Sequence, residues 1–139
     1  MNALPKNPPV AHAAHHAVVH VVDDHDLSRK HLRTVLGYHG YTVVLSAGAA
    51  QARTNLLITP PDAVLLDLQM PGEGGCELLA WMRQQPALAL VPVICVTASV
   101  PTSERERVQA AGFAAFVPKP ITPPQRLLDA LGAVLPPNF

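Results

Sequence analysis

Residues 63–68 read AVLLDL, and this run decides the fold. Five of its six residues are apolar, whereas a strand with one face in water alternates apolar and polar residues. A continuous apolar run of this length is typical of a strand in the middle of a parallel sheet, which is buried on both faces. We therefore predict a central strand that carries one carboxylate, Asp67, near its carboxyl end.

Four further short apolar runs, rich in β-branched residues, predict the other strands. They comprise residues 17–22 (AVVHVV), 41–45 (YTVVL), 91–96 (VPVICV) and 114–117 (AAFV). Pro118 follows the last run directly. Because proline cannot donate a hydrogen bond to a strand ladder, it is tolerated mainly on an edge strand. The fifth strand is therefore expected at an edge of the sheet.

A longer segment with helical spacing follows each apolar run. The helices are expected from near residue 26, over residues 47–57, in the segment before Pro86, over residues 102–111 and over residues 123–134. The residues expected to be buried in the first three helices are Leu32, Val35 and Leu36, then Ala50, Leu56 and Leu57, then Leu78, Leu79 and Met82. Strict alternation predicts an α/β fold, a flavodoxin-like (βα)5 doubly wound parallel sheet with strand order 2-1-3-4-5.

The overall composition excludes several classes of protein. Lys plus Arg number 10 and Asp plus Glu number 10, so the chain lacks the positive field that attracts nucleic acid or an anionic membrane. No apolar stretch reaches the roughly 18 residues that span a bilayer, and the amino terminus lacks the pattern of a secretion signal. The two cysteines, Cys76 and Cys95, lie in apolar runs and are expected in the core. We predict a cytoplasmic protein in a reducing compartment.

Prolines concentrate near both ends of the 139-residue chain, and we expect extended tails at residues 1–16 and 136–139 around one domain at residues 17–135. The amino-terminal stretch contains a histidine-rich tract, made by His12, His15, His16 and His20. We interpret this tract as solvated rather than as a metal site, because it contains no cysteine or carboxylate. Only a short segment follows the fifth helix, so we expect either a chain that acts alone or one excised from a larger protein, and the Met1 start favours the first of these.

In an open parallel sheet, the functional crevice lies at the carboxyl ends of the strands. The residues expected there are Asp23, Asp24, Asp67, Thr97, Ala98 and Lys119. Three carboxylates at close range repel one another unless a cation neutralises them, and Mg²⁺ prefers oxygen ligands of this kind. Lys119 adds an ammonium group and Thr97 adds a hydroxyl. Together these groups predict a phosphoryl-transfer site with a carboxylate nucleophile.

The chain resembles the response-regulator receiver family of two-component signalling proteins in four segments: VVDDHDLSR (21–29), VLLDLQMPGEGG (64–75), VTAS (96–99) and FVPKP (116–120). The resemblance covers about residues 17–135. It implies a signalling module rather than an enzyme, in which Asp67 accepts a phosphoryl group from a histidine kinase or a histidine phosphotransfer protein. It also implies a Mg²⁺ site made by Asp24 directly, by Asp23 largely through water, by Asp67 and by the backbone carbonyl of Gln69.

The same resemblance implies roles for residues around the acceptor. Lys119 would contact a phosphoryl oxygen, and the Thr97 hydroxyl would move toward the phosphate together with the backbone N–H of Ala98. Phe116 stands at the family's switch aromatic, which turns inward when that threonine moves. The Lys119–Pro120 peptide bond looks like the family's cis bond.

The family's output contact implies a downstream protein partner bound by the fourth helix, fifth strand and fifth helix. Glu104, Arg105 and Arg107 are candidates for that contact. The resemblance is compatible with a monomer or with a dimer that forms on phosphorylation, and it implies no direct binding to nucleic acid or membrane. The cognate kinase, the output partner and the lifetime of the phosphate are not specified by the sequence.

Three features stand out against the family's pattern, at four positions: 69, 73, 74 and 116. Phe116 stands where tyrosine is commoner, so its readout by a partner differs. Glu73 and Gly74 stand where the loop usually has a hydrophobic residue and an aspartate, so the edge of the site is expected to differ. Gln69 stands where the side chain often affects how long the phosphate survives.

Other interpretations of these residues remain open at the level of sequence. Asp23 and Asp24 also suit helix capping, although Asp26 is better placed as the cap. An Mg²⁺-dependent aspartyl-phosphate phosphohydrolase of the haloacid-dehalogenase type would need an acid two residues after the nucleophile, where this chain has Gln69. A flavodoxin-like cofactor binder would need a phosphate loop rich in Ser, Thr and Gly after the first strand, and no convincing one is present.

Overall fold

The run at residues 63–68 contributes the central strand β3, which spans Ala63–Leu66 and is buried at every position. Val64 and Leu66 face one hydrophobic core, whereas Ala63 and Leu65 face the other. Because alternate residues of a strand point to opposite faces, a strand covered on both faces needs apolar residues throughout. This geometry is the physical reason for the continuous apolar run.

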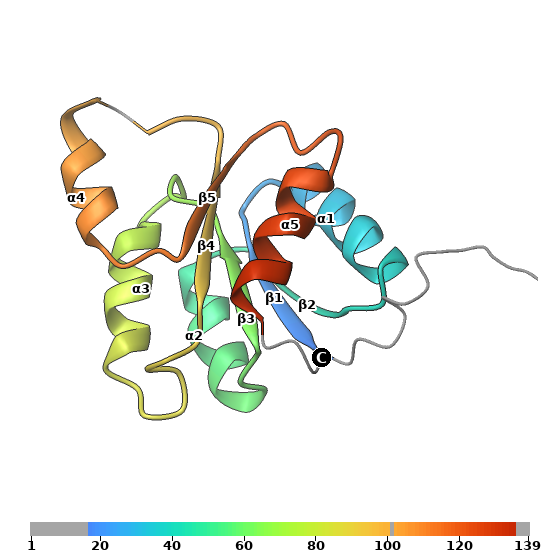
Figure 1. The fold of residues 1–139 in the computed structure, drawn as a ribbon. Helices are drawn as coiled ribbons and strands as arrows, with labels where there is room; N and C mark the ends of the chain where they lie inside the picture. The colour runs from blue at the N-terminus through green and yellow to red at the C-terminus, as the bar shows by residue number, and fades with distance from the viewer. Residues whose placement is uncertain (1–16, 101, 136–139) are drawn as a thin grey trace, which may run out of the picture.

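The structure is a computed structural model, and it describes residues 17–100 and 102–135. One five-stranded sheet has the order β2-β1-β3-β4-β5, with every neighbouring pair parallel (Figure 1). The strands are β1 (Val18–Val22), β2 (Thr42–Ser46), β3 (Ala63–Leu66), β4 (Val93–Thr97) and β5 (Ala115–Pro118). The helices are α1 (Asp26–Tyr38), α2 (Ala49–Ile58), α3 (Gly75–Arg83), the 3₁₀ turn η2 (Thr102–Glu104), α4 (Arg105–Ala110) and α5 (Gln125–Val134). The predicted fold class and strand order are confirmed.

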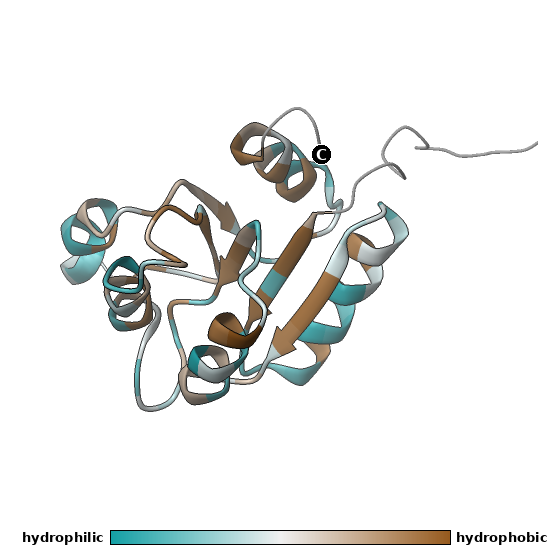
Figure 2. Ribbon diagram, turned by 90° about the horizontal axis from the view of Figure 1, so that it is seen from below, coloured by the Kyte–Doolittle hydropathy of each residue, from teal (hydrophilic) through white to brown (hydrophobic). Residues whose placement is uncertain are grey.

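Helices cover both faces of the sheet and form two cores (Figure 1). Leu32 and Leu36 of α1 pack with Leu127 and Leu131 of α5 on one face. Residues of α2 and α3, including Leu56, pack on the opposite face. The strands are the most continuously hydrophobic segments of the chain, whereas the helices are mixed (Figure 2). Within the described residues, no helix combines the length and apolar character that a membrane crossing requires.

Strand β5 lies at the edge of the sheet, as Pro118 predicts. Pro118 pairs in register with Thr97 of β4, and the next residue restores the ladder because the backbone N–H of Lys119 donates to the carbonyl of Thr97 at 2.9 Å. The Lys119–Pro120 peptide is cis, as predicted, and Thr122–Pro123 is a second cis peptide. The ladder thus places Lys119 directly beside the end of β4.

Two predictions about helices are wrong in detail. In α2 the buried residues are Ala49, Ala52 and Leu56, whereas Ala50 and Leu57 are exposed. The helix begins at Ala49, so positions 49, 52 and 56 share the inner face, and Leu57 lies about 100° further round the helix. The single helix expected over residues 102–111 is instead a 3₁₀ turn followed by the six-residue α4.

One cysteine and one histidine also differ from expectation. Cys95 is buried in β4, but Cys76 in the first turn of α3 is only half-buried. His20 belongs to β1 and is completely buried, so its assignment to a solvated tract is wrong. The β-branched residues on both sides of His20 give the strand signal that outweighs the histidine pattern. His12, His15 and His16, like the predicted tails, lie outside the described residues.

His20 is held in a buried polar chain. Its ring Nε2 lies 2.7 Å from Oγ of Ser46 in β2, and that oxygen also accepts a hydrogen bond from Nδ2 of Asn55 in α2 at 2.9 Å. Among the described residues, no partner contacts the buried Nδ1 of His20. Protonation would bury a charge and leave an unpaired N–H, and burial lowers the pKa of His20 to about 4. The ring is therefore neutral at pH 7.

The buried His20 ring predicts a pH dependence of stability. In the unfolded chain the ring protonates near its ordinary pKa of 6.5, whereas in the folded chain it protonates near 4. The unfolded state therefore binds more protons between these values, so the free energy of unfolding falls as pH drops below 6.5. The expected loss from pH 7.5 to pH 5 is on the order of 2 kcal/mol, measured by urea unfolding.

The matched control is His20→Gln, because a glutamine amide can still donate to Ser46 but does not titrate. The variant should lack this component of the pH dependence. Equal slopes of unfolding free energy against pH in both proteins would contradict the prediction.

Candidate functional site

Asp67 follows β3 directly and lies at the carboxyl edge of the sheet. Its backbone N–H donates to the carbonyl of Val22 at 3.0 Å, so the ladder between β1 and β3 continues through this residue. Its side chain is buried, and its Oδ1 accepts a hydrogen bond from the backbone N–H of Gln69 at 3.1 Å. The sheet and the following turn together fix the position of this carboxylate.

Asp23 and Asp24 follow β1 at the same edge. Asp23 is buried, with its backbone N–H bonded to the carbonyl of Ser46 at 3.1 Å and its Oδ1 accepting from the N–H of His25 at 2.8 Å. Its own carbonyl accepts from Nη1 of Arg29 at 2.8 Å, a contact that the sequence did not predict. Asp24 is exposed to solvent. One member of the pair is therefore held rigidly and the other faces the open side of the crevice.

The capping interpretation of this segment is wrong for Asp26. The residue at the N-cap position of α1 is His25, which makes no side-chain capping bond, and Asp26 is the first residue of the helix itself. The Asp26 carboxylate instead pairs with Arg29 at 2.9 Å and Lys30 at 3.1 Å, one turn further along. The hydrogen bond from Lys30, and then the positive charge of Lys30, lower the pKa of Asp26.

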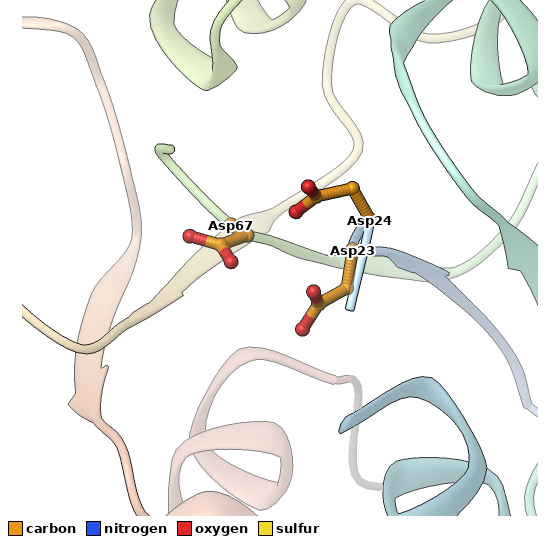
Figure 3. A group of neighbouring side chains, drawn as sticks. All are labelled: Asp23, Asp24 and Asp67. Atoms are coloured by element: carbon orange, nitrogen blue, oxygen red, sulfur yellow. The ribbon is translucent and has the colours of Figure 1, made fainter. Parts of the chain in front are cut away.

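The three carboxylates of Asp23, Asp24 and Asp67 meet at one place (Figure 3). One oxygen from each lies within 4.8 Å of the others. Like charges at this distance repel, and two of these side chains are buried. The donor set consists of carboxylate oxygens and contains neither sulfur nor imidazole, so it fits a divalent cation that prefers oxygen ligands. The predicted convergence of the three acids is present in the structure.

Lys119 reaches the same crevice from the end of β5. Its Nζ donates to Oδ2 of Asp23 at 2.8 Å and to Oδ2 of Asp67 at 3.1 Å. Burial by itself would lower the pKa of Lys119. The hydrogen bonds to the two carboxylates, together with the negative charges of those carboxylates, raise the pKa by more than burial lowers it, so the net pKa lies above its ordinary value. The group therefore stays a cation, although one ammonium leaves three carboxylates with excess negative charge.

Thr97 is the last residue of β4, and Ala98 follows it directly. Thr97 is buried, and its hydroxyl donates to the carbonyl of Ser99 at 3.3 Å, whereas Ala98 is exposed. Phe116 is 44% exposed. Thr97 and Phe116 line one cavity of about 350 Å³, together with Arg105 of α4. The residues assigned to a switch are thus neighbours around one hollow.

Gly75 is a residue of the site that sequence reasoning did not single out. A Cβ at this position would lie 2.8 Å from the carbonyl oxygen of Asp67 and 3.0 Å from Cα of Leu68. The Gly75 N–H donates to the carbonyl of Leu68 at 3.2 Å. Only glycine allows α3 to begin this close to the backbone of Asp67. The adjacent glycines at positions 74 and 75 were the available signal, but their spacing alone does not say which one is constrained.

The five-stranded sheet of this order, with three acids and a lysine at its carboxyl edge, is the arrangement expected of a receiver-type signalling module. The model of the response regulator receiver domain matches residues 19–132, and the chain belongs to that family. It is similar to the polar-differentiation response regulator DivK of Brucella ovis, with 31% identity over 117 residues that cover 84% of this chain and 94% of DivK.

Solved structures of response regulators share the fold of this chain. The chemotaxis protein CheY4 of Vibrio cholerae is 26% identical with a TM-score of 0.80, and the match covers 87% of this chain and all of that one. A response regulator receiver protein from Pseudomonas putida is 28% identical with a TM-score of 0.78, covering 86% of this chain and 98% of the other. The family is one of signalling modules rather than catalytic enzymes, so the phosphohydrolase alternative is not supported.

The close approach at Gly75 predicts a local cost for any side chain there. Gly75→Ala should lower the free energy of unfolding by about 1–3 kcal/mol, because the added methyl group must displace backbone. The matched control is Gly37→Ala in α1, where a Cβ would meet nothing within 4 Å. Helix propensity should make that variant more stable by about 0.5–1 kcal/mol. Urea unfolding measures both values, and a Gly75→Ala protein as stable as the wild type would contradict this interpretation.

Proposed function

We propose that this chain accepts a phosphoryl group on Asp67 from the phosphohistidine of a histidine kinase or a histidine phosphotransfer protein. The observation that carries the proposal is the position of Lys119, whose ammonium group bridges Asp23 and Asp67 from segments 96 and 52 residues away in sequence. The receiver unit in this proposal spans residues 17–135.

The proposed metal site uses Asp24 directly, Asp23 largely through water, Asp67 and the backbone carbonyl of Gln69. The all-oxygen donor set and the excess negative charge support Mg²⁺ as the ion. Bound there, Mg²⁺ would neutralise charge on the carboxylates and on the phosphoryl oxygens. The hydrogen bond from Gln69 N–H to Oδ1 of Asp67 turns the loop so that this backbone stays beside the acceptor.

In the proposed transfer, a carboxylate oxygen of Asp67 forms a bond to phosphorus while the bond from phosphorus to the imidazole nitrogen breaks, and the electron pair of that bond stays on the imidazole. Lys119 supplies a fixed positive charge for a phosphoryl oxygen, and it is already in position against Oδ2 of Asp67. Catalysis by such a site consists mainly of positioning and charge neutralisation, because the protein has little covalent chemistry to perform.

The proposed output switch uses Thr97, the N–H of Ala98 and Phe116. The Thr97 hydroxyl would leave the carbonyl of Ser99 for the phosphate, and Phe116 would turn from its exposed position toward the cavity that both residues line. Phosphorylation then shifts the population between two arrangements of this surface.

A downstream protein would bind the face made by α4, β5 and α5, either to a monomer or to a dimer formed on phosphorylation. Of the three candidate contact residues, Arg107 already pairs with Glu77 at 2.5 Å and Glu104 at 3.4 Å, whereas Arg105 lines the cavity beside Phe116. Arg105 is therefore the residue whose environment changes most directly if the ring turns inward. We propose no direct contact with nucleic acid or membrane.

Intact-mass measurement tests the acceptor. Incubation with Mg²⁺ and a small phosphodonor such as acetyl phosphate should give a single labile phosphoryl adduct on the wild type. Asp67→Asn should give none, because the amide is not a nucleophile for phosphorus, and a chelator of divalent ions should suppress labelling of the wild type.

Asp62→Asn is the matched control. Asp62 is a carboxylate at the opposite end of the sheet, where its Oδ2 accepts from the N–H of Val18 at 2.7 Å, and an asparagine can keep that hydrogen bond. This variant should label like the wild type. Labelling that persists in Asp67→Asn would show that Asp67 is not the acceptor. Labelling of the wild type that a chelator does not reduce would show that the reaction needs no divalent ion.

A further inference from the structure

The acceptor loop, residues 68–74 between β3 and α3, is tied to a neighbouring helix by a charged contact. Glu73 of this loop forms an ion pair with Arg53 of α2. The guanidinium carbon of Arg53 also lies 5.2 Å from the ring centroid of Trp81 in α3. One arginine therefore links the loop after Asp67 to both helices that cover this face of the sheet.

The environment of Arg53 restricts its movement. Its Nε is buried and has no hydrogen-bond partner among the described residues, although the side chain as a whole is 41% exposed. A donor left unpaired in this way is unfavourable, so other contacts must hold the side chain in place. The ion pair and the stacking on Trp81 are the contacts that do so.

The acceptor loop is anchored at two points. At its end, Gly75 lies against the carbonyl of Asp67 and donates to Leu68. Near its carboxyl end, at the second-to-last residue, Glu73 is held by Arg53. Gln69, whose backbone carbonyl is the proposed metal ligand, lies between Asp67 and these anchors, so restraint of the loop also restrains that carbonyl.

The charge at position 73 is the departure from the family's pattern noted in the sequence. A hydrophobic residue is usual there, and a hydrophobic side chain could not form an ion pair with an arginine opposite it. In this chain the acid has a specific partner, and that partner has a specific aromatic neighbour. Arg53, Glu73 and Trp81 therefore form one set of contacts that joins α2, the acceptor loop and α3.

We propose that Arg53 is a positioning residue, which acts through Glu73 to hold the acceptor loop in the conformation that binds the divalent cation at Asp23, Asp24 and Asp67. The inference rests on the proposed function. A loop already held in place loses less conformational entropy when the ion binds, so its restraint favours binding. Since Trp81 is the only tryptophan of the chain and touches Arg53, its fluorescence should respond to the state of the loop.

Magnesium titration, followed by calorimetry and by Trp81 fluorescence, tests the proposal on Arg53→Met and Glu73→Gln. Arg53→Met, which removes the ion pair and the cation–π contact, should weaken Mg²⁺ binding by about threefold to tenfold. Glu73→Gln, which removes the ion pair alone, should weaken Mg²⁺ binding by up to about fivefold. The double variant should bind Mg²⁺ little more weakly than Arg53→Met alone, because both changes remove the same restraint. The charge-exchanged double variant Arg53→Glu/Glu73→Arg should recover part of the lost affinity.

Long-range electrostatics makes the Arg53 variant diagnostic. Loss of a positive charge should by itself strengthen the binding of a cation, so weaker binding in Arg53→Met requires a positional effect. Lys30→Met is the matched control, because it removes a cation and an exposed ion pair with Asp26 on α1 without touching the acceptor loop. It should bind Mg²⁺ as tightly as the wild type or slightly more tightly.

Arg53→Lys keeps the charge with a smaller stacking contact, and it should bind Mg²⁺ with an affinity between those of Arg53→Met and the wild type. Thermal unfolding of the ion-free proteins verifies that each variant folds. The proposal would be overturned if Arg53→Met bound Mg²⁺ at least as tightly as the wild type while Glu73→Gln bound Mg²⁺ more weakly. That result would show that Glu73 acts by its charge alone. Failure of the wild type itself to bind Mg²⁺ would instead reject the proposed function.

Discussion

The Nζ of Lys119 joins the carboxyl ends of three strands, because it bonds at once to Asp23 after β1 and to Asp67 after β3 from its own place after β5. This ammonium group pairs directly with two of the three converging carboxylates and so offsets part of their mutual repulsion. The attraction is strong because the partners are largely buried, where water screens charges poorly. In the proposed function the same group also contacts a phosphoryl oxygen, so one cation both offsets the charge of the carboxylates and supports the proposed transfer.

The parallel sheet makes this arrangement possible, because hydrogen-bond ladders run through the site residues themselves. Asp67 bonds to Val22, and Lys119 bonds to Thr97, so the backbone of each functional residue extends a strand pair. Side chains built on such a frame are held more precisely than those on a free loop. The acceptor loop is the part of the site outside this frame, and there the chain uses the close approach at Gly75 and the pairing of Glu73 with Arg53.

Much of the fold and the central chemistry could be predicted because their signals are local. The run at residues 63–68 marks a strand buried on both faces, and the rule for parallel sheets then brings Asp67 to the acids after β1. Predictions failed where tertiary contacts decide. The inner face of α2 depends on where that helix begins, and the burial of His20 depends on the partners that the sheet brings to it.

The sequence by itself determined the order of strands and helices, the edge position of β5 and the identity of the residues in the crevice, because periodicity, proline and strand-end position act within a few residues of one another. Only the tertiary structure decided which side chains away from the strand ends pair across 20 or more residues: Glu73 with Arg53, and His20 with Ser46. Pair contacts of this kind depend on how two helices or strands lie side by side, and no periodic pattern in either segment records its partner.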